Sequence, residues 1–382
     1  MKILIVSTDY PPMKGGISVL SHAKAREFHD AGHEVLVLAC CEDFQAARAF
    51  DALQPFVTVR FSGRFPWREL QIAPVVWWQI RRFRPDVVWS ALWYPAAVVV
   101  SYCAPKSVVQ TVSTYGSEIF ISQADWKLRL KAAMGPWRRR VFAKCQVIFA
   151  LSRYTREKIL ELGASAAKIQ IVRGGVGSAW FDLPHLASSP ILLTVARLDA
   201  HKGHARVIEA LPQILARHPA LRYVMVGPDA NNWERLRQKA TELGVSDKVD
   251  YRGAVSWPEL QSAYQNATVF VMASREIPGR LDLVEGFGLT FLEAAAIGVP
   301  SVAGDSGGVP DAVEHEVSGL LVDPNSAEQI AAAVIRLLDD ADYRNQLGSQ
   351  ARQRALREFT WTHLASLMLD AFQNVLEEKK KL

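Results

Sequence analysis

The stretch RGGVGSAWFDLPHLASSPILLTV, residues 173 to 195, decides the fold predicted for this chain. Its part up to Pro190 is rich in Gly, Ser and Pro and has no hydrophobic period, which is typical of a boundary between domains. The apolar run that follows, Ile191 to Val195, is typical of a buried strand. A pattern of strands and helices therefore ends at this stretch and begins again after it.

Short apolar runs alternate with longer amphipathic segments on both sides of this boundary. Strands are predicted at residues 3–6, 35–38, 86–89, 108–111 and 147–150, and after the boundary at 191–195, 223–226, 249–251, 269–272, 301–303 and 319–322. Helices are predicted at residues 17–31, 67–83, 126–142 and 154–162, and after the boundary at 327–339, 343–358 and 361–376. This alternation predicts two doubly wound α/β halves, each with a parallel sheet covered on both faces.

The length and composition agree with two domains. A chain of 382 residues is too long for one ordinary core and suits domains of ~150 to 200 residues. We predict a first domain at residues 1–175, a second at 176–358, and a closing helix at 359–382 that packs back toward the first domain. The composition is that of a globular protein, and the mild net charge of +5 gives no reason to expect nucleic acid as a partner.

The sequence favours a cytoplasmic protein. Four cysteines without CxxC spacing predict neither a zinc site nor a disulfide framework, which fits a reducing compartment. Lys2 is followed by only four apolar residues, too few for the hydrophobic region of a signal peptide. Residues 87–105 carry no charge and approach the ~20 residues that span a bilayer. However, Pro95 and the turn residues around it favour a buried strand, a turn and a short helix.

The loops that follow the strands hold the candidate site, because doubly wound sheets bind ligands beyond the carboxyl ends of their strands. With two such halves, the cleft between them is the expected place. After the first strand, Gly15 and Gly16 precede a helix whose free N–H groups and dipole can bind an anion, although a simple tight turn has the same sequence. After the first strand of the second half, Arg197 and Lys202 can neutralise an anion, although each alone is typical of a surface charge.

The stretch EGFGLTFLE begins with Glu285 and ends with Glu293. A helix predicted from Leu289 onward puts Glu293 in its early turns and Glu285 on the loop before it. The two carboxylates can accept hydrogen bonds from hydroxyl groups in two parts of one elongated ligand. The N–H groups of Phe287, Gly288 and Leu289 would face the anionic middle of that ligand. For either acid alone, a simpler reading is open: Glu293 as a partner of the helix dipole, and Glu285 as a surface acid.

This pattern resembles the retaining glycosyltransferases of family 4, which have the GT-B fold of two doubly wound Rossmann-like domains facing across a cleft. The resemblance runs from YPPMKGG, which begins at residue 10, to GLLVDP, which ends at residue 324. It depends on the E-x7-E spacing of Glu285 and Glu293, supported by ARLDAHKG and GDSGGVPDAV. The run from residue 280 to 313 is most similar to bacterial mannosyltransferases that modify phosphatidylinositol.

The resemblance implies a role for each matching residue in binding a nucleotide-sugar donor. Gly16 would approach the diphosphate of the donor, and Arg197 and Lys202 would neutralise it. Glu293 would bind the ribose hydroxyls, and Glu285 would bind the transferred sugar together with the backbone N–H groups that follow it.

Two further positions follow from the resemblance. The stretch from Tyr251 to Val255 would line the pocket of the nucleotide base, mostly through its backbone. Where the family commonly has a histidine in a His-Gly-x-Glu stretch, this chain has Tyr115 in STYGSEI. Tyrosine can donate a hydrogen bond, but its ordinary pKa of ~10 makes it a poor proton acceptor at neutral pH.

The implied reaction moves a hexose from a GDP- or UDP-linked donor to a hydroxyl of a lipid-linked or glycan acceptor, with retention and without a metal or other cofactor. Fixed cations and N–H groups would stabilise the charge that grows on the diphosphate. We expect Glu285→Ala or Lys202→Ala to abolish transfer and to leave the fold intact. Two alternatives stay open: a nucleotide-sugar-binding protein with little transferase activity, suggested by Tyr115, and a nucleotide-sugar epimerase of the same fold.

Other motifs are assigned simpler roles. The GDSGG sequence is also the serine signature of trypsin-like proteases, but the α/β pattern excludes their β-barrel and leaves a glycine turn. Asp340 and Asp342 form a D-x-D motif between two predicted helices, where a capping role is expected. His201 and His204 flank Lys202 without a partner acid or Cys at suitable spacing, so no metal site is predicted.

Two stretches of the first half, residues 65–85 and 125–144, combine basic and aromatic residues with apolar residues at helical spacing. Helices that lie on anionic lipid have this pattern, and so do helices packed on a sheet. A peripheral membrane surface, at the cytoplasmic face, would therefore lie on the first domain.

Overall fold

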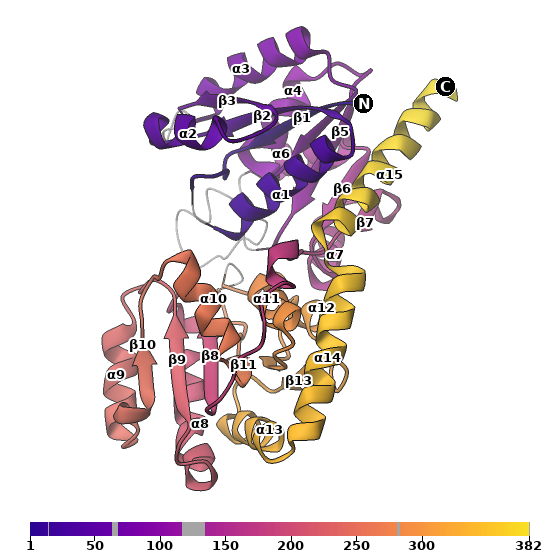
Figure 1. Ribbon diagram of the computed structural model, residues 1–382. Helices are drawn as coiled ribbons and strands as arrows, with labels where there is room; N and C mark the ends of the chain where they lie inside the picture. The colour runs from indigo at the N-terminus through magenta and orange to yellow at the C-terminus, as the bar shows by residue number, and fades with distance from the viewer. Residues whose placement is uncertain (14, 63–67, 117–133, 281–282, 382) are drawn as a thin grey trace. The chain divides into compact units, whose positions relative to one another are not determined.

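The computed structural model describes residues 1–13, 15–62, 68–116, 134–280 and 283–381, with only the backbone described at 68–70. The chain forms two compact units, shown in Figure 1. The first consists of Met1–Gly174 together with Trp361–Leu382, and the second consists of Gly175–Thr360. The last helix therefore belongs to the first unit, which is built from both ends of the chain.

The first unit contains a seven-stranded parallel sheet with the order β3-β2-β1-β4-β5-β6-β7. Its strands are β1 (Lys2–Ser7), β2 (Glu34–Cys40), β3 (Val57–Phe61), β4 (Val87–Ser90), β5 (Val109–Thr114), β6 (Val147–Ala150) and β7 (Ile169–Ile171). Its α-helices are α1 (Gly16–Asp30), α2 (Phe44–Asp51), α3 (Arg68–Phe83), α4 (Val98–Cys103), α6 (Gly135–Lys144), α7 (Arg153–Glu161) and α15 (Trp361–Lys381).

The second unit contains a six-stranded parallel sheet with the order β10-β9-β8-β11-β12-β13. Its strands are β8 (Ile191–Val195), β9 (Arg222–Val226), β10 (Val249–Tyr251), β11 (Val269–Met272), β12 (Ser301–Gly304) and β13 (Gly319–Val322). Its α-helices are α8 (His204–Arg217), α9 (Trp233–Glu242), α10 (Trp257–Gln265), α11 (Leu289–Ile297), α12 (Val309–Ala312), α13 (Ala327–Asp339) and α14 (Ala341–Glu358). The predicted fold class, two doubly wound α/β units, is confirmed.

Each sheet has one switch point, a pair of neighbouring strands from which the chain continues toward opposite edges of the sheet. The chain leaves β1 toward one edge of the first sheet and returns to the other side of β1 at β4, and the second sheet does the same between β8 and β11. In doubly wound sheets the carboxyl ends of such strands mark the ligand site. The residues that follow β8 and β11 are therefore in the right place to bind a ligand.

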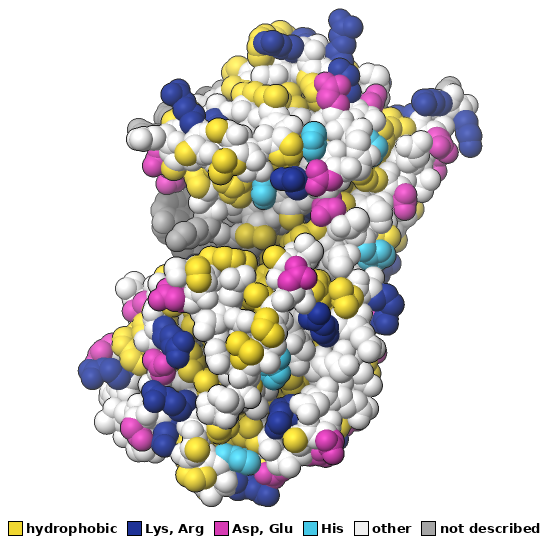
Figure 2. Space-filling view, viewed as in Figure 1, with side chains coloured by type: hydrophobic (Ala, Val, Ile, Leu, Met, Phe, Trp, Pro, Cys, Tyr) yellow, Lys and Arg dark blue, Asp and Glu magenta, His cyan; other side chains and the backbone are white. Residues whose placement is uncertain are grey.

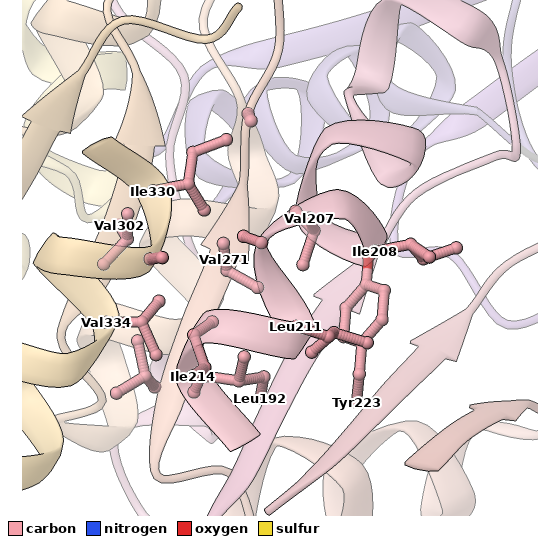
Figure 3. Packing of buried hydrophobic residues seen from close by; sticks show 14 of the residues in the cluster. Leu192, Val207, Ile208, Leu211, Ile214, Tyr223, Val271, Val302, Ile330 and Val334 are labelled. Carbon is pink, nitrogen blue, oxygen red and sulfur yellow. The ribbon is translucent and has the colours of Figure 1, made fainter. Parts of the chain in front are cut away.

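Apolar side chains cover both faces of each sheet. Figure 3 shows Leu192, Val271 and Val302 of the second sheet packed under residues of α8 and α13. In the first unit, α3 and α4 cover one face, and α1 and α15 cover the other. On that second face, the ring of Phe372 from α15 lies 5.8 Å from the rings of Phe28 and Phe149. Burial on both faces is the reason why most strands are continuous apolar runs.

The predictions for residues 87–105 and for the D-x-D motif are confirmed. β4 ends at Ser90, and a short helical stretch leads into α4. Asp340 caps α14 by accepting a hydrogen bond from the Tyr343 N–H at 2.8 Å. Across the described ranges, no helix combines the length and the apolar character that a membrane span requires.

Candidate active site

The two predicted cations lie on one loop, which connects β8 to α8. Lys202 ends a short 3₁₀-helix, Ala200–Lys202, and only 18% of its side chain is exposed. Arg197 lies at the start of the loop with 65% of its side chain exposed, and its guanidinium pairs with Asp199 at 2.7 Å. Lys202 is therefore the fixed, inner cation of this loop, and Arg197 is the outer one.

Lys202 forms an ion pair with Glu285, which lies 83 positions further along the chain. Lys202 Nζ is 2.5 Å from Glu285 Oε2, and 13% of the Glu285 side chain is exposed. Burial alone would raise the pKa of Glu285, but the Lys202 ammonium and a hydrogen bond from the Phe287 N–H hold it below its usual range. Glu285 is therefore a mostly buried carboxylate paired with a cation, and the interpretation of it as a surface acid is wrong.

The GDSGG turn after β12 fixes the backbone of Glu285. The Gly308 N–H donates to the Glu285 carbonyl at 2.8 Å. Gly307 has a φ of +57°, and a Cβ there would come within 2.5 Å of the same carbonyl oxygen. The GDSGG motif, which the sequence analysis interpreted as a simple glycine turn, therefore positions one of the two acids of the E-x7-E motif, because only glycine fits so close to that carbonyl.

Glu293 lies inside α11, which begins at Leu289 as predicted. Its Oε2 accepts a hydrogen bond from the Tyr264 hydroxyl at 2.6 Å. Burial raises the pKa of Glu293 to about 7, and the Tyr264 hydrogen bond offsets part of that effect. The two acids thus differ: Glu285 is paired with a cation and its pKa lies below its usual range, whereas the pKa of Glu293 is raised by burial.

Aromatic rings surround the Tyr264 side of Glu293. The ring of Trp180 lies 5.1 Å from the ring of Tyr264 and 5.1 Å from that of Trp257. Trp257 begins α10 directly after the loop that contains Val255, which was predicted to line the base pocket. That role of Val255 stays a prediction.

The remaining predicted residues lie in the first unit. Gly15 and Gly16 line a small cavity of 190 Å³ at the start of α1. Arg60 holds the preceding stretch in place, because it donates to the Pro11 carbonyl at 2.6 Å. Tyr115 follows β5, and its side chain is buried. The roles of these residues in donor binding stay predictions.

The histidines beside Lys202 lie in the short 3₁₀-helix of this loop and at the start of α8. Both His201 and His204 are buried, and burial lowers the pKa of each to about 4. Within the described part of the chain, no cluster of three or more His, Cys, Asp or Glu side chains is placed to hold a metal ion.

Three groups at this site were not identified from the sequence: Tyr264, the Gly307–Gly308 turn, and His204, which donates to the Arg197 carbonyl. Tyr264 lies in a helix whose sequence has no feature that points to Glu293. A Gly-Gly pair after a strand signals a tight turn, but it does not say which carbonyl that turn contacts.

Comparison with known protein families divides the chain close to the boundary between the two units of the structure. Residues 14–179 match the family model described as Glycosyltransferase Family 4, and residues 181–354 match the one described as Glycosyl transferases group 1. A GDP-mannose-dependent alpha-(1-6)-phosphatidylinositol monomannoside mannosyltransferase of Mycobacterium tuberculosis is 30% identical over 381 residues, which cover 97% of each protein. A GDP-mannose-dependent monoacylated alpha-(1-6)-phosphatidylinositol monomannoside mannosyltransferase of Corynebacterium glutamicum is 26% identical, over 100% of this chain and 99% of the relative.

Solved structures share the fold at lower identity. A glycosyltransferase from Rickettsia africae matches with a TM-score of 0.80 at 19% identity, over 98% of this chain and 99% of that one. Anabaena HepE in complex with UDP matches with a TM-score of 0.79 at 18% identity, over 98% of this chain and 100% of that one. The shared fold is the GT-B fold.

Proposed function

This chain belongs to the family-4 glycosyltransferases, and on that premise we propose that it moves a hexose from a nucleoside diphosphate donor to a hydroxyl of a lipid-linked or glycan acceptor. The proposal includes retention at the anomeric carbon and a reaction without a metal ion. The observation that carries it is the buried Lys202–Glu285 pair, which lies where ligands bind in doubly wound sheets.

The charges of this pair suit the reaction. The acceptor hydroxyl would attack the anomeric carbon while the bond from that carbon to the phosphate oxygen breaks, and the leaving phosphate would take the acceptor proton. Negative charge grows on the diphosphate during this step, and a cation that is already fixed stabilises it without reorganisation. Lys202 is such a cation, because Glu285 holds it at 2.5 Å. Arg197 can add a bidentate contact to phosphate oxygens.

The donor is expected to be GDP-linked. The relatives from M. tuberculosis and C. glutamicum are named for GDP-mannose, and they are more similar in sequence than HepE, which was solved with UDP. We expect GDP and GDP-mannose to raise the melting temperature by about 5 °C at a hundredfold excess over Kd, and UDP and ADP to raise it less. A thermal-shift panel of the three nucleotides, each with its sugars, measures this. A panel in which no nucleotide stabilises the protein would refute the proposed function.

Tyr115 is the observation that favours the second candidate, a nucleotide-sugar-binding protein with little transferase activity. Its buried ring stands where the family commonly has a histidine, and a phenol is a poor proton acceptor at neutral pH. Donor binding without transfer, together with a gain of activity in Tyr115→His, would favour this candidate. Conversion of the donor sugar with no acceptor present would instead identify an epimerase.

The acceptor is proposed to be lipid-linked, because α3 exposes both tryptophans and arginines. Its Ile72, Val76 and Ile80 are buried against the sheet, so the expected packing role is confirmed for that face. On the other face, Trp77 and Trp78 are about half exposed, and Arg81 lies 3.7 Å from the Trp77 ring centroid. Figure 2 shows basic side chains beside hydrophobic ones at the edge of the first unit where Figure 1 places α3.

Anionic vesicles are expected to bind the protein through this face of α3. Exchanging Trp77 and Trp78 for alanine should lower the fraction that floats with phosphatidylcholine–phosphatidylinositol vesicles about tenfold, because two large apolar rings no longer enter the interface. Trp257→Ala, which removes a similarly exposed ring from the second unit, is the control and should float like the wild type. Equal losses from both substitutions, or no flotation of the wild type, would rule out this surface.

A further inference from the structure

The loop from Ala196 to Gly203 carries both cations of the candidate site, and its backbone is held by neighbouring loops. Four hydrogen bonds do this: Ala196 N–H to Val226 O (2.9 Å), Leu198 N–H to Pro228 O (3.1 Å), Asn232 Nδ2–H to Leu198 O (2.8 Å) and Arg275 N–H to His201 O (2.8 Å). The Arg197 carbonyl lies between the hydrogen-bonded residues Ala196 and Leu198, and its own partner is a side chain.

That partner is the imidazole of His204, in the first turn of α8. Only 2% of His204 is exposed. Its Nε2 lies 3.2 Å from the Arg197 carbonyl oxygen, and its Nδ1 lies 3.2 Å from the Tyr223 hydroxyl. A carbonyl oxygen only accepts, so Nε2 carries the hydrogen and Nδ1 is the acceptor. Burial lowers the pKa of His204 to about 4, so the ring keeps this neutral form at neutral pH.

Tyr223 and Thr194 continue this chain of buried polar groups beneath α8. The Tyr223 hydroxyl lies 2.9 Å from Thr194 Oγ1, and Thr194 donates its own hydrogen to the Val271 carbonyl of β11. The single hydrogen of Tyr223 is therefore shared between two acceptors, Thr194 Oγ1 and His204 Nδ1. Figure 3 shows Tyr223 among the apolar side chains, with its hydroxyl oxygen at the end nearest α8. A polar group buried among apolar side chains is costly unless it is hydrogen-bonded, so each member of the chain restricts the position of the next.

We propose that His204 is a positioning residue for sugar transfer, which donates from Nε2 to the Arg197 carbonyl and so fixes the loop that presents Lys202 to the donor diphosphate. The proposal rests on the proposed function of Lys202. His204 acts through the loop rather than on the donor, because both of its ring nitrogens are engaged by the protein.

Gly203 limits how the loop can adjust if this hydrogen bond is lost. It joins Lys202 to α8 with a φ of +80°, a conformation that favours glycine. A methyl group at Gly203 would overlap the Ala273 carbonyl, so the backbone already lies against β11's exit loop. The loop therefore has no room to move toward Ala273. We expect an Arg197 carbonyl that has lost its hydrogen bond to turn toward water and to displace Lys202 with it.

The test compares two substitutions of His204. His204→Phe keeps a ring and removes the donor, and we expect it to raise the Kd for the nucleoside diphosphate about ten- to a hundredfold and to lower kcat by a similar factor. Binding of the nucleoside, which has no phosphate, should change by less than about threefold, since Lys202 does not contact it. His204→Gln, whose side-chain amide can donate from nearly the same position as Nε2, should restore diphosphate binding to within about threefold. GDP with guanosine and UDP with uridine are the probes.

Two controls separate positioning from general stability. Ile214→Ala removes a fully buried side chain further along α8, so it should lower the melting temperature and leave diphosphate affinity unchanged where the protein is folded. His185→Phe removes another Nε2 hydrogen bond to a backbone carbonyl, that of Ala267 at 2.8 Å, and should bind like the wild type.

The outcomes distinguish this inference from the function beneath it. Wild-type diphosphate affinity in His204→Phe, or an equal loss in Ile214→Ala, overturns the inference. A nitrogen-15 NMR spectrum that shows His204 protonated at Nδ1 instead of Nε2 also overturns it. If the wild type itself binds none of GDP, UDP and ADP, the proposed function fails, whatever the variants do.

Discussion

Replacing Lys202 with methionine is expected to lower kcat for sugar transfer by about a thousandfold, since one preorganised group facing developing charge typically contributes a factor of about 10²–10³. The same substitution should also lower the free energy of unfolding by about 3–5 kcal/mol, because it leaves a buried carboxylate unpaired. That carboxylate is Glu285, of which 13% is exposed. Glu285→Gln leaves the ammonium unpaired instead and should have the same two effects.

The double variant Lys202→Met/Glu285→Gln separates catalysis from stability. It removes both buried charges, so its free energy of unfolding should return to the wild-type value or exceed it, whereas kcat should stay low. The sequence alone predicted that alanine at Lys202 or at Glu285 leaves the fold intact, and the ion pair changes that expectation for any single substitution that leaves one charge unpaired. Urea unfolding and the rate of transfer from the donor, measured on all three variants, test both statements.

Lys239→Met is the matched control for this experiment. Lys239 Nζ also lies 2.5 Å from a glutamate, Glu209, but this pair joins α8 and α9 and is more exposed. Its loss should cost about 1 kcal/mol or less and leave kcat unchanged. If the Lys202→Met/Glu285→Gln variant transfers sugar at the wild-type rate, the Lys202–Glu285 pair has no part in the mechanism.

Exchanging Glu293 for glutamine is expected to stabilise the protein above pH 7 and to weaken donor binding. Burial raises the pKa of Glu293 from 4.5 to about 7 in the folded protein. The carboxyl thus contributes to stability fully below its unfolded pKa, and this contribution is lost as the pH rises through 7. Glutamine stays neutral, so the variant should be more stable by about 1–3 kcal/mol above pH 8. At pH 4 the two proteins should have similar free energies of unfolding.

Donor binding should change in the opposite direction to stability. A carboxylate can accept hydrogen bonds from two ribose hydroxyls, whereas glutamine offers one oxygen, so the donor KM of Glu293→Gln should rise about tenfold or more at pH 8. The wild-type KM should fall as the pH rises through 7, and the variant should lack this dependence. Urea unfolding and donor KM between pH 5 and 9 measure both effects. A variant that is less stable than the wild type at pH 9 would contradict the proposed environment of Glu293.

The strands of the second unit were predicted more completely than those of the first, whereas the helices α8, α9 and α10 of the second unit were expected only as unnamed helices between strands. All six strands of the second unit were predicted to within a residue, including β10, an edge strand that contains Asp250 and is only partly buried. In the first unit, β3 and β7 were missed: each lies at an edge of the sheet, is only partly buried, and has its apolar run interrupted by polar residues. β10 shares these features and was predicted, so they make an edge strand harder to predict without excluding it. α2 was missed because it is short, although Asp43, which caps it, was a usable signal. The helix predicted at residues 126–142 begins at Gly135 within the described residues, and its part up to residue 133 lies outside them.

The candidate site was predictable in its residue types and not in its contacts. Strand ends and loop composition pointed to Lys202 and Glu285, and the E-x7-E spacing of the resembling family was needed to select Glu293; the roles of all three in donor binding stay predictions. Their partners come from distant parts of the sequence, as Tyr264 does for Glu293, and a single sequence has no period that links such positions. The role of His204 depends on two distances, to Arg197 and to Tyr223, that only the packed structure supplies.

The position of α15 in the chain, after the second unit, has a consequence for folding during biosynthesis. The ribosome makes Trp361 and the rest of this helix after the whole second unit, yet the helix belongs to the unit that contains Met1. Phe372 packs against Phe28 and Phe149, so these early residues have no complete core while translation continues. The second unit, by contrast, has its whole sequence before α15 is made. The half of the chain that is translated first is thus the half whose core is completed last.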